Sequence, residues 1–243
     1  FAGETNIGKS IFLGNVAHNI ATEGKNVLLV TLEMSELLYA RRICTNVTKV
    51  PMKELVGNTP AIKQAIKEEK GKIFIKEFPP ASITPNQLKG FIKKFQEQGI
   101  QLDAIILDYL NLMHSTMGNN SYERIKHVTE QVRAMSYLFN CPIISATQLN
   151  RAGFDTDNPD LATISESIGL AATADVICSI FQNEEDRELG IIRLGMMKNR
   201  YGPRGTTQAM RINYSTLSIE EADDIEFEDD SMETLNALAG LAS

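Results

Sequence analysis

The chain has few features of exported, membrane-spanning or zinc-binding proteins. Its three cysteines (Cys44, Cys141, Cys178) are odd in number and far apart, and the last two lie in apolar runs typical of strands. We therefore expect reduced core thiols rather than a disulfide framework. The three histidines show no ligand spacing, so we expect no zinc site. No run approaches the roughly 18 apolar residues of a membrane span, and the chain does not open like a signal peptide, so we expect a cytoplasmic protein.

The sequence also lacks an excess of basic residues. Its net charge is −7, but nine acidic residues and no Lys or Arg occur from position 220 onward. Residues 1–219 hold 24 basic and 22 acidic residues, which is a net charge of +2. A nearly neutral body weakens the case for avid duplex binding, which usually requires a basic face. A narrow channel that grips one strand is still compatible with this charge.

Apolar residues make up 43% of the chain and charged residues 23%, which predicts a packed globular core. Short apolar runs alternate with longer helical segments, a pattern typical of an α/β fold with a parallel sheet. The continuous apolar character of the strands indicates burial on both faces. The predicted strands are 27–31, 73–75, 104–107, 143–147, 176–181, 191–197, 208–212 and 217–219. The predicted helices are 9–22, 35–45, 61–69, 85–98 and 121–139.

Local signals refine this prediction. Asn120 with Glu123 three residues later resembles a capping box, and Pro85 marks another helix start. The last three strands follow one another without helices, which favours an antiparallel extension. Two long polar segments, 114–120 and 150–163, follow strands in the middle of the order. Ligands bind beyond the carboxyl ends of parallel strands, so these are candidate binding loops, although plain surface loops would look the same.

The chain divides into two parts by composition. We expect one domain over residues 1–219 and an acidic, disordered tail over residues 220–243. Because only two residues precede the first motif, we expect a piece of a longer protein that lacks an N-terminal domain and the first strand. The end of the tail spaces four apolar residues as on one helix face (Met232, Leu235, Leu238, Leu241), which fits a partner-binding helix or equally a solubilising tail.

The strongest motif stands at the start of the chain. Gly3-Glu4-Thr5-Asn6-Ile7-Gly8-Lys9-Ser10 matches G-x-x-x-x-G-K-[ST], and Ile11 continues it into the first predicted helix. The glycines let the backbone wrap a phosphate, whose charge then meets N–H groups and a helix N-terminus. Lys9 would reach the β- and γ-phosphates, and the Ser10 hydroxyl would bind Mg²⁺. The motif predicts a nucleotide-binding loop with ATP and Mg²⁺ as cofactors.

Two carboxylates are candidate partners of this loop. Asp108 ends the apolar run 104–107 and would hold the hydrated metal, although an aspartate there could merely cap the next turn. Glu33 follows the strand 27–31, from which a carboxylate can reach the γ-phosphate side and act on the attacking water. Glu33 could equally start the next helix, and the residues alone do not decide between these roles.

The ordered set of motifs resembles DnaB-type hexameric replicative helicases. After the phosphate loop come T-L-E-M-S (31–35), D-Y-L-N-L-M (108–113), S-A-T-Q-L-N-R (145–151) and K-N-R-Y-G (198–202), and segment 166–175 is most similar to T-even phage replicative helicases. The likeness covers residues 1 to about 215. It implies a RecA-like P-loop NTPase, with a mostly parallel twisted sheet and helices on both faces. The implied activity is ATP-driven 5′–3′ translocation on single-stranded DNA and unwinding of the duplex at the replication fork.

The resemblance also implies roles for single residues. Glu33 would be the catalytic base, and Gln148 would sense the γ-phosphate. Lys198 and Arg200 would reach into the neighbouring subunit's site, with Arg200 as an arginine finger. Without the family, both would be interpreted as solvated turn residues.

By the same resemblance, loops around 111–120 and 150–166 line a central channel and hold DNA by its backbone. Bacterial members carry an arginine directly before the glutamate that matches Glu166, and this chain has Ser165 there. The implied partners are single-stranded DNA, a homo-hexamer, and a primase and helicase loader in the full-length protein. The predicted DNA-binding residues are Arg151, Glu166, Ser167 and Gly169.

Three other functions compete with this interpretation. The nearest is another RecA-like DNA-dependent ATPase such as a recombinase, against which Asp108-Tyr109-Leu110 and Lys198-Asn199-Arg200 favour a helicase. A nucleotide-gated scaffold without useful turnover is a second, and Glu33 argues against it. A small-molecule kinase is a third, but no lid or acceptor-site motif is visible.

Overall fold

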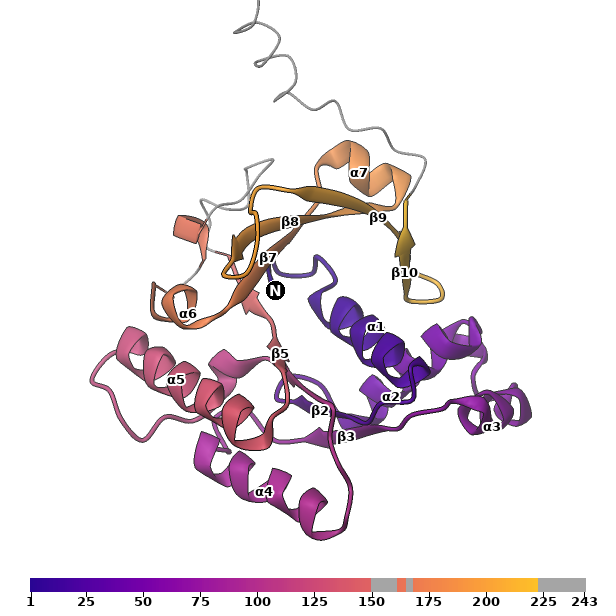
Figure 1. Ribbon diagram of the computed structural model, residues 1–243. Helices are drawn as coiled ribbons and strands as arrows, with labels where there is room; N and C mark the ends of the chain where they lie inside the picture. Colours follow the sequence, from indigo (N-terminus) through magenta and orange to yellow (C-terminus); the bar gives the residue numbers. More distant parts are fainter. Residues whose placement is uncertain (150–160, 165–167, 223–243) are drawn as a thin grey trace, which may run out of the picture.

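The computed structural model describes residues 1–149, 161–164 and 168–222, arranged as Figure 1 shows, and confirms the predicted α/β class. The strands are β1 (Ala2–Gly3), β2 (Val27–Thr31), β3 (Ile73–Glu77), β4 (Ala104–Asp108), β5 (Ile143–Ser145), β6 (Thr147–Gln148), β7 (Val176–Phe181), β8 (Ile191–Asn199), β9 (Thr207–Asn213) and β10 (Ser218–Glu221). The helices are α1 (Lys9–Thr22), α2 (Glu36–Thr48), α3 (Thr59–Glu68), α4 (Pro85–Glu97), α5 (Ser121–Phe139), α6 (Ile168–Thr173) and α7 (Glu184–Leu189). Short 3-10 turns are η1 (Met52–Glu54), η2 (Leu110–Leu112) and η4 (Leu161–Thr163).

The strands form two hydrogen-bonded sheets that meet along the chain. One has the order β3-β2-β4-β5 and the other β6-β1-β7-β8-β9-β10. Strands β5 and β6 are separated by Ala146 alone, so the chain passes directly from one sheet into the other. Pairing is parallel from β3 to β7 and antiparallel from β7 to β10. The predicted antiparallel extension is confirmed, and it already includes the pairing of β8 with β7.

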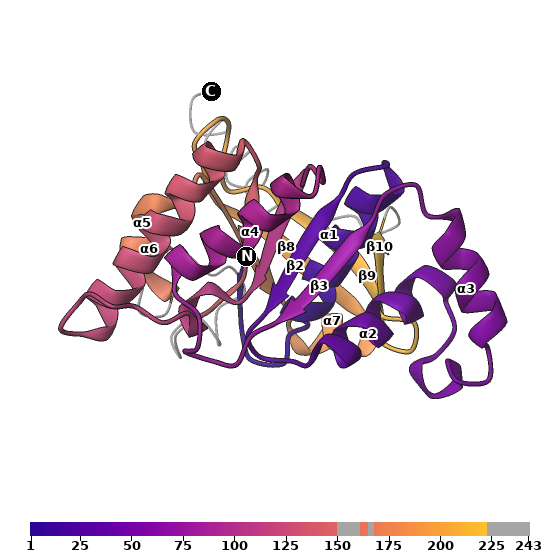
Figure 2. The same cartoon turned by 90° about the horizontal axis from the view of Figure 1, so that it is seen from below.

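The buried strands alternate their side chains between two helical layers. In β2, Leu28 and Val30 face the core under α4 and α5, whereas Val27 and Leu29 face the core under α1 and α2. This alternation is the period of two expected of strands covered on both faces. Figure 2 shows β2 and β3 with α4 and α5 on one side and α1, α2 and α3 on the other.

Helix α1 is tied to the C-terminal hairpin by a buried amide network. Asn15 donates to the carbonyls of Ile11 (2.8 Å) and Leu217 (2.9 Å), and its own oxygen accepts from Asn46 Nδ2 (2.6 Å) and the Ile219 N–H (3.0 Å). Asn15 and Asn46 are both buried, so their amide groups must find hydrogen-bond partners within the protein rather than in water.

Replacing Asn15 with leucine, a side chain of similar size, is expected to lower the free energy of unfolding by about 2–3 kcal/mol, because buried donors on Asn46 and Ile219 lose their acceptor. Urea denaturation would measure the loss. Asn19→Leu is the matched control, since Asn19 is exposed on the same helix and should change stability little. Equal stability of the two variants would contradict a structural role for the network.

Several boundaries differ from the sequence prediction for identifiable reasons. Asn120 caps α5 by accepting from the Glu123 N–H at 2.8 Å, but the Glu123 carboxylate accepts from the Asn119 N–H, so only half of the expected capping box forms. The predicted strand 143–147 is broken at Ala146, where the chain changes sheets. Helices α6 and α7 were not predicted, because six residues give no clear periodicity. The strand before the motif was expected to be missing, but Ala2 and Gly3 form it as β1.

The C-terminal boundary also lies later than expected. Strand β10 runs to Glu221, so the first two acidic residues assigned to the tail belong to the sheet. The rest of the tail prediction falls on residues 223–243, which lie outside the described residues. Among the described helices, none is both long and apolar enough to cross a membrane.

Candidate nucleotide-binding site

The phosphate-binding motif begins where β1 ends in the middle of the sheet. Strand β1 pairs in parallel with β6 and β7, with Gly3 beside Gln148 and Ile180. A Cβ at Gly3 would lie 2.9 Å from the Ile180 carbonyl oxygen, and Gly8 has φ of 99°, a left-handed conformation that favours glycine. Both glycines of the motif are therefore required by the backbone, and the loop delivers its N–H groups to the start of α1.

Lys9 lies inside this loop. Its ammonium donates to the carbonyls of Gly3 (3.0 Å) and Glu4 (2.5 Å). Burial lowers the pKa of Lys9, and the negative charges of Glu33, Asp108 and Glu4 act in the opposite direction. The predicted carboxylates Glu33 and Asp108 are thus close enough to the lysine for their charges to act on it.

Asp108 ends β4 and is 1% exposed. Its carboxylate accepts a hydrogen bond from the Tyr39 hydroxyl at 3.1 Å. Burial raises the pKa of Asp108, and the nearby hydroxyls of Ser10 and Tyr39 oppose the rise. The turn after Asp108 is capped by a different side chain, because the Leu110 N–H donates to Ser145 Oγ at 3.1 Å. The alternative that Asp108 merely caps the next turn is therefore not supported.

The oxygens of Ser10 and Asp108 suit a magnesium ion. Mg²⁺ at nucleotide sites takes one or two protein oxygens and completes its shell with phosphate oxygens and water. The Ser10 hydroxyl lies close enough to the Asp108 carboxylate to act on its pKa, and the two oxygens are a ligand set of this kind. The residues present fit Mg²⁺ bound together with a nucleotide.

The register of the sheet brings Glu33 and Gln148 to the same edge. Thr31 pairs with Asp108, so Glu33, two residues further on, lies just past the metal-side carboxylate. Glu33 is exposed, and Ser35 rather than Glu33 is the N-cap of α2, so the alternative that Glu33 starts the helix is wrong. Gln148 is the register partner of Gly3. The roles of Glu33 as base and Gln148 as sensor stay predictions.

Lys198 and Arg200 lie at the opposite end of the strands from the phosphate loop. Lys198 pairs with Ile177, three residues before the loop's neighbour Ile180, which is about 10 Å along β7. Their interpretation as solvated turn residues is wrong for Lys198, which is half-buried within β8. Its ammonium donates to the carbonyls of Ala171 (2.7 Å) and Ala172 (3.3 Å) at the C-terminal end of α6.

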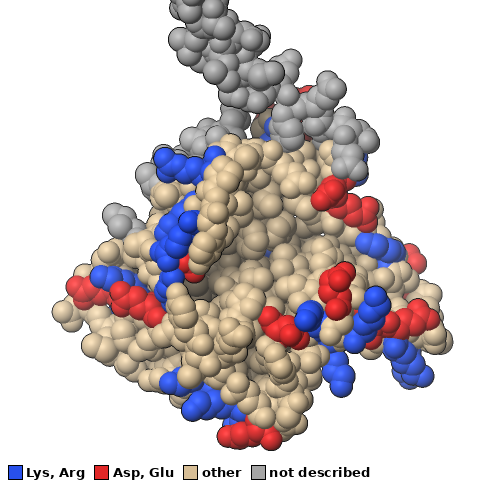
Figure 3. All heavy atoms as spheres, viewed as in Figure 1, with Lys and Arg blue, Asp and Glu red and all other residues tan. Residues whose placement is uncertain are grey.

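Arg200 belongs to a cluster that the sequence did not predict. Its guanidinium contacts the Asp175 carboxylate at 2.6 Å, and Arg133 of α5 contacts the same carboxylate oxygen at 2.9 Å. Arg133 also donates to the Thr173 carbonyl. In Figure 3, Lys and Arg atoms form a narrow line on the left of this face, in the region where Figure 1 shows α6 and β8. Nothing in the local sequence pattern pairs Arg133 with Asp175, because 42 residues separate them.

Of the four predicted DNA-binding residues, the structure describes Gly169. Arg151, Glu166 and Ser167 lie outside the described residues. Gly169 is buried at α6, where an added Cβ would lie 3.0 Å from the side chain of Lys126 on α5. The close packing of α6 against α5 therefore explains why a glycine stands at position 169. Its contact with DNA stays a prediction.

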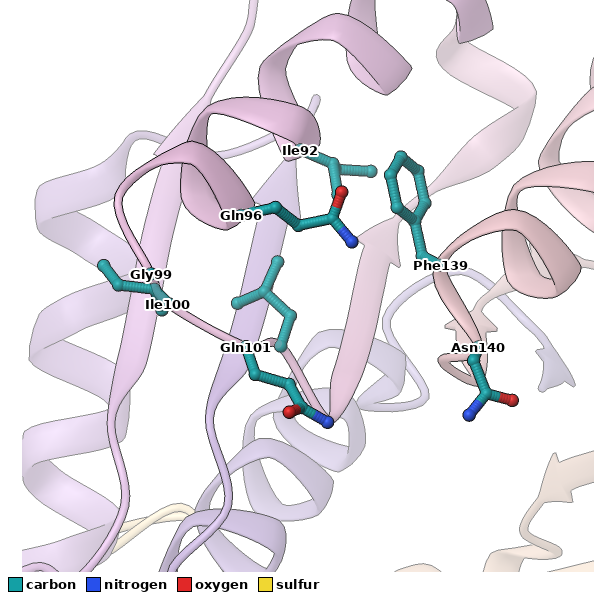
Figure 4. Close-up of a pocket in the computed structure, with 8 residues that line it drawn as sticks. Ile92, Gln96, Gly99, Ile100, Gln101, Phe139 and Asn140 are labelled. Atoms are coloured by element: carbon teal, nitrogen blue, oxygen red, sulfur yellow. The ribbon is translucent and has the colours of Figure 1, made fainter.

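A cavity of about 310 Å³ lies far from this site, between the ends of α4 and α5. Figure 4 shows Gln96, Gln101, Phe139 and Asn140 around it, and none of its lining residues carries a charge. It lies at the amino end of β4, whereas the phosphate loop is at the carboxyl edge of the sheet. A cavity without cations does not suit a nucleotide's phosphates.

Comparison with known proteins gives one consistent result. The model of the DnaB-like helicase C-terminal domain family matches residues 1–217. The DnaB-like replicative helicase of Enterobacteria phage T4 is 26% identical, over 97% of this chain and 52% of its own length. The replicative DNA helicase DnaB of Geobacillus stearothermophilus is 26% identical, over 85% of this chain and 48% of its own length. The chain thus spans about half the length of these relatives.

Solved structures agree on the fold. One of them, an ATPase domain, has a TM-score of 0.79 and 19% identity, and the match covers 91% of this chain and 83% of that one. A DnaB-like replicative helicase, described with its interactions with primase, also has a TM-score of 0.79, with 18% identity, 91% of this chain and 56% of that one. The RecA-like architecture expected from the motifs is confirmed.

Proposed function

Because the chain belongs to the DnaB-like helicase C-terminal domain family, we propose that it is the ATP-hydrolysing motor domain of a ring-shaped replicative DNA helicase. The observation that carries the proposal is the division of the site between two ends of the sheet. Lys9, Ser10 and Asp108 gather at the carboxyl edge of the parallel strands. Lys198 and Arg200 lie at the other end of β7, where the register partner of Lys198 is three residues, or about 10 Å along the strand, from the register partner of Gly3. In a ring, Lys198 and Arg200 of one subunit would meet the phosphate loop of the next subunit, so that both ends of the strands contribute to one site.

Each residue of the loop has a part in hydrolysis. Lys9 and the loop N–H groups bind and orient the β- and γ-phosphates, and Ser10 and Asp108 hold the magnesium side. When bound, Mg²⁺ neutralises charge that develops on the phosphates. Glu33 takes the proton of the attacking water, and Gln148, beside Gly3, responds to the γ-phosphate. Arg200 of the adjacent subunit then stabilises the charge on the transferring group.

The same proposal includes the partners. Single-stranded DNA passes through the centre of a homo-hexamer and is held by the loops around 111–120 and 150–166, with Arg151, Glu166, Ser167 and Gly169 in contact. Movement runs 5′ to 3′. The full-length protein works with a primase and a loader in the cytoplasm, which is the host's if a phage encodes it. The alternative is a DNA-dependent ATPase of the recombinase kind.

Two measurements test the proposal. Single-stranded DNA is expected to stimulate ATP hydrolysis at least several-fold, and the protein should separate a forked duplex that carries a 5′ tail. Lys9→Ala should weaken nucleotide binding and hydrolysis together, because the loop loses its cation. Stimulation by DNA with strand exchange but no unwinding would favour the recombinase alternative. Nucleotide binding with no turnover under any condition would favour a scaffold.

A further inference from the structure

We propose that Tyr39 is a positioning residue that holds Asp108 in place for the metal ion; this inference rests on the proposed function. Tyr39 lies on α2, outside the motifs that mark the site in the sequence, yet its side chain ends between two of them. Its hydroxyl is 3.1 Å from the Asp108 carboxylate and 3.1 Å from the backbone carbonyl of Ser10. One side chain thus contacts both residues on the metal side of the phosphate loop.

The surroundings of Tyr39 fix this hydroxyl in place. The residue is completely buried, and its ring packs among apolar side chains of α1, β2 and β4, including Leu13, Leu29 and Ile106. The ring also lies against α1 at Gly14. Because the packing locks the ring, the hydroxyl has no water to turn to and must donate to one of its two acceptors. An ionised carboxylate is the stronger acceptor of the two.

The carboxylate depends on such donors as well. Asp108 is 1% exposed, Tyr39 donates to it at 3.1 Å, and the Ser10 hydroxyl lies close enough to lower its pKa. The Ser10 hydroxyl is itself a predicted metal ligand, so metal binding would take it away from Asp108. Tyr39 would then be the side-chain donor that keeps the carboxylate oriented while the metal is bound. Groups that hydrogen-bond a metal ligand in this way commonly change metal affinity by about 10- to 100-fold.

A simpler explanation is that the contacts merely give the buried Tyr39 hydroxyl a hydrogen-bond acceptor. That explanation does not account for the position of the hydroxyl beside Asp108. The Ser10 carbonyl alone would satisfy the one donor of Tyr39. The contact with Asp108 adds nothing that the tyrosine needs, whereas Asp108 gains a donor from it. The two explanations differ in one measurable respect, which is whether the loss of the hydroxyl changes metal binding separately from nucleotide binding.

Tyr39→Phe removes the hydroxyl and keeps the packed ring. The experiment uses the whole chain, loaded with a non-hydrolysable ATP analogue, and follows bound Mn²⁺ by loss of the free-ion electron paramagnetic resonance signal. We expect the half-saturating Mn²⁺ concentration to rise about tenfold. Affinity for the analogue in EDTA should stay within about twofold, since Lys9 and the loop N–H groups are intact. Tyr214→Phe is the matched control, because Tyr214 is half-exposed on the β9–β10 turn, and it should change neither value.

A second variant tests whether the effect passes through Asp108. In an Asp108→Asn background, which keeps the buried volume, Tyr39→Phe should change Mn²⁺ binding by less than about twofold. Unchanged Mn²⁺ binding in Tyr39→Phe alone overturns the proposal. So does an equal loss of Mn²⁺ and metal-free nucleotide affinity, which would mean that Tyr39 supports the whole loop. If the parental chain binds no nucleotide-dependent Mn²⁺, the proposed function itself fails, which is a different result.

Discussion

Arg200→Ala is expected to lower DNA-stimulated ATP hydrolysis by about 10³- to 10⁵-fold, a barrier increase of about 4–7 kcal/mol, while nucleotide affinity stays within a few-fold. Charge builds up on the transferring phosphoryl group, and Lys9 is the cation that the motif of the same chain places beside the phosphates. Arg200 lies at the other end of β7 from the loop, so we expect it to supply the remaining charge to the neighbouring subunit. Arg204→Ala is the matched control, since Arg204 is exposed on the same hairpin.

Mixing two inactive variants decides whether the finger acts across the interface. An Arg200→Ala subunit keeps its own phosphate loop, and a Lys9→Ala neighbour keeps its Arg200, so one working site is rebuilt where the two meet in the right order. Random mixing of equal amounts in a head-to-tail ring rebuilds about a quarter of the sites. We therefore expect partial recovery of ATPase in the mixture. Mixed rings that stay as inactive as either component would place the action of Arg200 within its own chain.

Glu33→Gln has the second largest expected effect. The variant should bind ATP normally but hydrolyse it about 10²-fold or more slowly, because the amide cannot take a proton from the attacking water. Binding of a fluorescent ATP analogue and single-turnover hydrolysis separate the two steps. Glu36→Gln is the matched control and should leave hydrolysis unchanged. Glu36 is the next carboxylate along the chain, and it forms an ion pair with Lys76 at 2.7 Å instead of facing Lys9. Parental hydrolysis by Glu33→Gln would remove Glu33 from the mechanism.

The sequence predicted the parts of the site that depend on short, contiguous patterns. The glycines at positions 3 and 8 could be recognised because the backbone there needs glycine, and Asp108 because an apolar run ends at it. Strands covered on both faces were found by their continuous apolar character, and β2 and β7 begin and end where predicted. Each of these signals arises from local conformation or burial, so a single sequence carries it.

Contacts between distant segments were not predictable in the same way. Tyr39 is an aromatic residue on the buried side of a helix, and nothing in its neighbourhood indicates that its hydroxyl meets Asp108, 69 positions away. The ion pairs of Asp175 with Arg133 and Arg200 depend equally on how α5, α6 and β8 pack. A helix of six residues such as α6 is defined mainly by what it packs against, so its boundaries follow from tertiary structure.

Ala146 is the point at which the chain passes from one sheet into the other. Among the described residues, it links β5, which pairs with the strand that ends in Asp108, to β6, which pairs with the strand that feeds the phosphate loop. A rotation of one sheet against the other would change the backbone angles at Ala146, because hydrogen-bonded ladders hold the strands on either side of it. Such a rotation would move the phosphate loop relative to Asp108, since the two belong to different sheets.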